Sequence, residues 1–87
     1  MKIRLTLVGE CKALALMKEQ AKFKLHEANG AGSKYNFEGI VGQYLTKVNA
    51  LRAIQGRESI VYSIRHYRSI NSALKDVEII ADGYSIA

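Results

Sequence analysis

The strongest pattern in the chain is a run of helix-forming residues at positions 10–28, where an apolar residue recurs every three or four positions. Ala, Leu, Lys, Glu, Gln and Met dominate this run, and all of them favour helices. Asn29 and Gly30 follow it and supply a left-handed stop. The spacing predicts one long amphipathic helix. Its core-facing stripe would consist of Leu14, Met17, Ala21, Leu25 and Ala28.

The rest of the chain has to cover this stripe within one small domain, because 87 residues leave no room for a second one. A chain of this size buries only about 60–65% of the surface that its unfolded form exposes. An apolar fraction of 48% with 24% charged residues is typical of a globular domain and excludes intrinsic disorder. We therefore expect residues 1–87 to form a single folded domain.

The single cysteine bears on where the protein resides. Cys11 has no partner for an internal disulfide, whereas small secreted domains usually need such bridges. A cytoplasmic location is therefore expected. The sequence also lacks any run of 18 apolar residues, and its first residues lack the long hydrophobic region of a signal peptide. We expect no membrane partner.

Three segments favour β-strands. Residues 2–8 alternate between apolar and polar side chains, as in a strand with one wet face. Residues 59–67 are rich in β-branched and aromatic residues. Five residues between 60 and 74 also fall on one helical face, so one long helix is the alternative, but composition favours a strand followed by a short helix near 69–75. A third strand is expected at Val77, Ile79 and Ile80, before a turn at Asp82 and Gly83.

Residues 37–55 carry apolar side chains at helical spacing, and Gly56 would cap the helix that they predict. Gly39 and Gly42 weaken this prediction, and a strand over 37–46 is the alternative. The order of elements predicts an α+β fold in which helices cover one face of a small sheet of about three strands. If residues 37–46 were a strand, the order would be ferredoxin-like.

The positive charge is unevenly distributed along the chain. Residues 1–75 carry a net charge of +8 and the last twelve residues carry −3, which permits a polyanionic partner. Tyr62, Arg65, His66, Tyr67 and Arg68 lie in one stretch without an acid. Such side chains stack on bases and neutralise phosphates, and they also dominate protein–protein interfaces. The alternative is that the tyrosines pack in the core and the arginines are merely solvated.

Leu16 and Phe23 project from the side of the predicted helix opposite its core stripe, among charged residues. One interpretation is that another element covers this side as well. The other is that the two side chains are exposed and anchor a partner or a homodimer.

No combination of residues in the sequence predicts catalysis, a cofactor or a metal site. His26 and His66 lie forty residues apart with Cys11 as the only thiol, which is not the spacing of zinc ligands or of a nucleophile–base pair. Asp76, Glu78 and Asp82 form the only acid cluster, and a solvated strand edge is its expected role. We therefore expect a protein that is not an enzyme.

These features favour a non-catalytic interaction protein, a small regulator or inhibitor that docks on a larger protein or nucleoprotein complex. Small accessory proteins of phages and mobile elements share this profile. The alternative function is direct binding of RNA or DNA through residues 62–68. The expected partner-binding residues are Leu16, Phe23, Tyr62, Arg65, His66, Tyr67 and Arg68.

Overall fold

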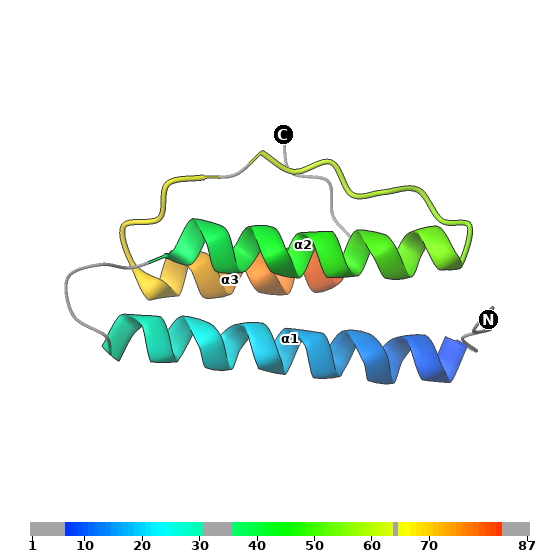
Figure 1. Ribbon diagram of the computed structural model, residues 1–87, viewed down its shortest axis with the longest axis horizontal. Coiled ribbons are helices and arrows are strands. Elements are labelled where there is room, and N and C mark those ends of the chain that lie inside the picture. The colour runs from blue at the N-terminus through cyan, green and yellow to red at the C-terminus, as the bar shows by residue number, and fades with distance from the viewer. Residues whose placement is uncertain (1–6, 31–35, 64, 83–87) are drawn as a thin grey trace.

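Three helices and one long extended connection form the computed structural model, which describes residues 7–30, 36–63 and 65–82, with the backbone alone for 7–11 and 82. The helices are α1 (Leu7–Gly30), α2 (Phe37–Ile54) and α3 (Ile70–Asp82). Figure 1 shows α1 antiparallel to α2, and α3 running in the same direction as α2. Two successive helices can be parallel only if the chain returns between them. Residues 55–69 make this return along α2, on the side away from α1 (Figure 1).

The predicted α+β fold is wrong, because residues 7–30, 36–63 and 65–82 contain three helices and no strand. The ferredoxin-like alternative fails with it, since residues 37–46 lie within α2. Of the strand expected at 2–8, residues 2–6 lie outside the described part of the chain, and Leu7 and Val8 begin α1. The described residues of the segment at 59–67 form no strand, and Ile60, Tyr62 and Tyr67 pack against the helices, although Tyr62 makes a single bridge.

The strand expected at residues 77–80 is also wrong, because these residues belong to α3. Ala73, Val77 and Ile80 are fully buried, and they recur every three or four positions. Ile70 and Leu74 pack against the same core from the adjacent positions. The short run of β-branched residues suggested a strand, but helical spacing over the longer segment decides the structure, since it places one continuous apolar stripe against α1 and α2.

The predictions for the first two helices are confirmed. In α1, Ala21 and Leu25 are buried and the other three residues of the predicted stripe pack against the core. In α2, the buried side chains follow helical spacing. They are Phe37, Val41, Tyr44, Val48 and Leu51. None of the helices in the described residues has the length and apolar composition needed to cross a bilayer.

Two glycines have clear structural reasons at the ends of α2. A Cβ atom at Gly39 would lie 2.5 Å from the Oδ1 atom of Asn36, whose side chain folds over the first turn. A larger residue at position 39 would therefore displace the exposed Asn36 side chain. Gly56 follows the helix with φ of +70°, a left-handed conformation that glycine adopts without strain, as predicted for the cap.

Asn49 fastens the returning segment to α2. Its side-chain amide donates to the backbone carbonyl of Ile60 at 3.2 Å, and its Oδ1 atom accepts from the Ile60 N–H at 2.8 Å. Ile60 is buried, so without Asn49 both of its backbone groups would lose their partners in a place that water reaches poorly. One helical side chain therefore replaces the neighbouring strand that a sheet would have supplied.

We expect Asn49→Ala to lower the free energy of unfolding by about 1–3 kcal/mol, because it leaves two buried backbone groups unpaired. Thr46→Ala is the matched control, since the Thr46 hydroxyl is exposed and bonds only to the Gly42 carbonyl of its own helix. The control should change stability by less than about 0.5 kcal/mol. Urea denaturation followed by circular dichroism measures both variants, and equal effects would contradict the role of Asn49.

Candidate interaction surfaces

A buried carboxylate holds the second half of the returning segment against α3. Asp76 is only 5% exposed, and its Oδ2 atom accepts hydrogen bonds from the hydroxyls of Tyr62 at 2.6 Å and Tyr67 at 2.8 Å. The two hydroxyls also contact each other. A buried carboxylate needs such donors, because an unpaired charge in the protein interior is strongly unfavourable. The solvated strand edge expected for Asp76, Glu78 and Asp82 is wrong, because all three residues belong to helix α3 and Asp76 is buried.

The environment of this cluster raises the pKa of both tyrosines. Burial, with the hydrogen bond to Asp76, raises the pKa of Tyr62 to about 12. Burial, with the hydrogen bonds to Tyr62 and Asp76, also raises the pKa of Tyr67 well above its ordinary value. Both phenols thus stay protonated and remain donors across the physiological pH range.

A basic hollow lies between this segment and α3. We use this name for the surface formed by Arg65, His66, Arg68, Ser72 and Lys75, with Tyr67, Asp76 and Ile79 below it. Because the hydroxyls of Tyr62 and Tyr67 both bond to Asp76, residues on either side of Arg65 are attached to α3, and Arg68 follows Tyr67 directly. The cationic side chains themselves are exposed.

The cations of the basic hollow differ in their pairing. Among the described residues, no ion pair is formed by Arg65, Arg68 or Lys75. His66, in contrast, contacts Glu38 of α2, with 2.8 Å between its Nδ1 atom and Oε1. The backbone amides of Glu38 and Tyr67, together with His66, hold the pKa of the Glu38 carboxyl below its usual value. The three unpaired cations are therefore the part of the hollow that can bind an anion.

Two lysines of α1 share one acidic partner on α3. Lys18 and Lys22 of α1 both contact the Glu78 carboxylate of α3, and the Lys18 distance is 3.3 Å. The hydrogen bond to Lys22 is the main reason that the pKa of Glu78 is lowered. These pairs cross the groove between α1 and α3 and leave little free charge there.

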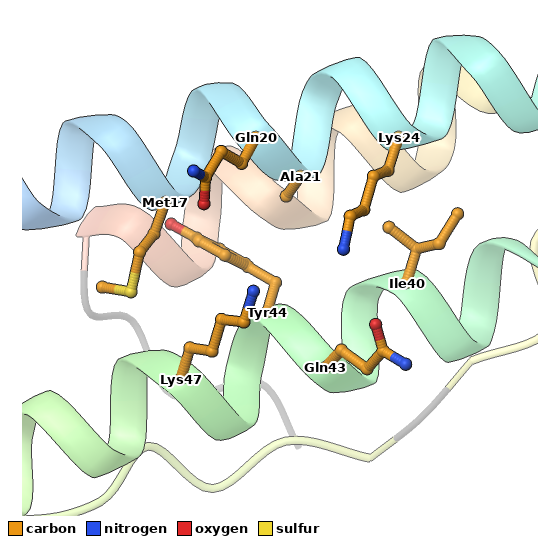
Figure 2. A pocket seen from close by; sticks show the side chains of 8 residues that line it. All are labelled: Met17, Gln20, Ala21, Lys24, Ile40, Gln43, Tyr44 and Lys47. Carbon is orange, nitrogen blue, oxygen red and sulfur yellow. The ribbon is translucent and has the colours of Figure 1, made fainter.

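A second surface, the α1–α2 groove, consists of two adjoining hollows that share Gln20, Lys24 and Lys47. Figure 2 shows the Lys24 and Lys47 side chains pointing into the space between the helices, beside the ring of Tyr44. Phe23 borders this groove and is 68% exposed. Leu16, two turns earlier on the same side of α1, is 61% exposed. The interpretation that another element covers these two residues fails for the described part of the chain.

The seven residues expected to bind a partner therefore fall into two groups on different surfaces. Arg65, His66 and Arg68 line the basic hollow. Tyr67 is buried beneath it and Tyr62 is half-buried, so the tyrosines mainly hold the segment. Phe23 lies on α1 at the α1–α2 groove, and Leu16 is exposed two turns earlier on the same helix, outside the residues that line the groove.

Sequence reasoning missed several members of both surfaces. Ser72 and Lys75 of α3 join the basic hollow, and the signal for them was their spacing of three residues, which places both on one face of a helix. Lys24 and Lys47 meet across the α1–α2 groove from different helices. No local pattern connects these two lysines.

The groups considered for catalysis or metal binding do not form a cluster among the described side chains. His26 is exposed on α1, His66 contacts Glu38, and the Cys11 side chain lies outside the described part. Within the described residues, no three His, Cys, Asp or Glu side chains come together as a metal site would require. No protein-family model, curated protein or solved structure matches this chain.

We expect the tyrosine cluster to make stability fall in alkaline solution. The pKa of the Tyr62 phenol is near 10 in the unfolded chain and about 12 in the folded protein. Its contribution to stability is therefore complete below pH 10, and it is lost as the pH rises through the folded value. Titration of tyrosinate absorbance should show a late phase above pH 10. Tyr62→Phe/Tyr67→Phe should lack it. An unchanged titration in this variant would contradict the assignment.

Proposed function

We propose that this protein is a non-catalytic interaction module, a small regulator or inhibitor that docks through the basic hollow on an acidic surface of a larger protein or nucleoprotein complex. The observation that carries the proposal is the convergence of Arg65, Arg68 and Lys75 without any partner among the described residues. Guanidinium groups bind carboxylates with two parallel hydrogen bonds, and so they suit recognition of acidic side chains.

The fixed backbone beneath the hollow supports this function. Binding is weakened when flexible groups must be ordered, and a segment already held in place avoids much of that loss. The Tyr62 and Tyr67 hydrogen bonds to Asp76 hold the segment on both sides of Arg65. Only the long side chains themselves remain to be ordered by the partner.

Direct nucleic-acid binding receives less support from the same residues. A duplex binder typically makes about 6–10 phosphate contacts, whereas the basic hollow offers three unpaired cations. Base stacking needs exposed aromatic rings, but Tyr67 is 8% exposed and Tyr62 is half-buried with its hydroxyl bound to Asp76. The acidic protein surface is therefore the preferred partner.

We expect Arg65→Ala/Arg68→Ala to weaken binding of a fluorescein-labelled oligoglutamate peptide about fivefold, because two exposed ion pairs are lost at roughly 0.5 kcal/mol each. The melting temperature should change little, since neither side chain is buried. Lys12→Glu changes the net charge by the same two units at an exposed position of α1 away from the hollow, and it should leave affinity nearly unchanged. Fluorescence anisotropy and thermal denaturation provide the two readouts. Equal weakening by both variants would contradict docking through the hollow.

The salt dependence of binding separates the two partner classes. If only the hollow contacts a DNA duplex, the logarithm of the binding constant should fall with the logarithm of salt concentration with a slope no steeper than about −3, at about 0.9 per phosphate contact. A slope of about −6 or steeper would require contacts well beyond the hollow. That result, with tighter binding to DNA than to oligoglutamate, would replace protein docking by nucleic-acid binding.

A further inference from the structure

The three grooves between the helices differ in what covers them. The extended segment contacts both α2 and α3, through Asn49 and through Asp76. Ion pairs of Lys18 and Lys22 with Glu78 cross between α1 and α3. The α1–α2 groove is different, because each described residue that lines its two hollows belongs to α1 or α2. No described segment outside these helices contributes to it.

The chemistry of the α1–α2 groove is apolar at its border and basic inside. Phe23 and Leu16 present exposed apolar side chains along α1. Lys24 and Lys47 extend into the groove from opposite sides (Figure 2), and among the described residues that line it Glu19 is the only acid. A complementary occupant therefore needs apolar side chains on one face and carboxylates beside them.

We propose that the α1–α2 groove binds an acidic amphipathic helix of a partner protein, which lies along it as a fourth helix. Helices dock in grooves of this kind through apolar residues three or four positions apart, here against Phe23 at the groove and then against Leu16 where the helix continues along α1. Carboxylates beside that stripe would pair with Lys24 and Lys47. The inference extends the proposed docking function, since it adds a second surface that also selects acidic partners.

A second copy of this chain fits the groove poorly. Two α1 helices packed antiparallel would bring Leu16 against Phe23 of the other copy, but the same axis would place Glu19 next to the other Glu19. Lys24 and Lys47 would likewise meet no opposite charge from the equivalent groove, which carries lysines of its own. Charge complementarity thus favours a different, acidic chain.

The test uses the full chain and a synthetic 18-residue helical peptide, with Leu at positions three and four apart and Glu on either side of that stripe. A peptide of the same composition in scrambled order and one with Lys in place of Glu are the controls. We expect the acidic helix to bind most tightly, and to shift the amide resonances of residues 16–24 and 40–47. Phe23→Ala and Lys24→Glu/Lys47→Glu should each weaken binding about tenfold, as for anchor residues of an interface. Lys12→Glu is the control, since Lys12 is exposed on α1 and lines neither surface, and it should change binding less than twofold.

Three results would overturn the groove assignment. The first is equal binding of the ordered and scrambled peptides, or no resonance shift at millimolar peptide. The second is loss of binding in Arg65→Ala/Arg68→Ala with no effect of the Lys24/Lys47 variant, which would place the acidic peptide in the basic hollow and leave the proposed function intact. The third is a dimer in light scattering that dissociates on Phe23→Ala, because a second copy would then occupy the groove.

Discussion

The buried carboxylate of Asp76 determines where the extended segment lies, and the rest of the surface depends on that position. The carboxylate is compatible with its site because the Tyr62 and Tyr67 hydroxyls donate to it. Both tyrosines belong to the extended segment and Asp76 belongs to α3. The hydrogen bonds that the buried carboxylate needs therefore attach the segment to α3. Arg65 lies between these two points, and its exposed side chain therefore projects from a backbone that α3 holds in place.

The connection between α2 and α3 explains why this fastening is needed. A short loop would have made the two helices antiparallel, whereas residues 55–69 return along α2 and leave the helices parallel (Figure 1). An extended chain outside a sheet has unpaired backbone groups along its whole length. Asn49 satisfies two of them at Ile60, and the Arg52 guanidinium donates to the Glu58 carbonyl at 3.2 Å. Side chains of α2 thus take the place of a neighbouring strand.

How much of this fold the sequence predicts depends on the length of each pattern. Residues 10–28 and 37–55 were long enough for helical spacing to identify α1 and most of α2. The segment at 59–67 was misjudged because β-branched residues favour an extended backbone, and composition alone does not reveal whether that backbone pairs with a strand or lies on helices. In α3, the adjacent Ile79 and Ile80 suggested a strand, although Ala73, Val77 and Ile80 already had helical spacing.

For the interaction surfaces too, local sequence predicted some residues and tertiary packing was needed to find the others. Arg65 and Arg68 were identified because they are neighbours in the sequence, and Phe23 because its position on α1 follows from helical geometry. Lys75 could be assigned to the hollow only after residues 70–82 were found to be helical. Lys24 and Lys47 line one groove because α1 packs on α2. Local sequence determines which side chains are available, whereas packing between elements determines which of them act together.

The two surfaces would contribute to docking by different physical means. Exposed cations in the basic hollow attract an acidic partner over roughly one Debye length, about 8 Å at physiological salt, which raises the rate of encounter and fixes its orientation. The exposed Phe23 and Leu16 act only in contact, and their burial slows dissociation. A partner that reaches both surfaces gains from their linkage, because the second contact forms within one complex. Such a partner must carry acidic groups at both contacts and an apolar stripe at only one, which distinguishes it from a uniformly charged polyanion.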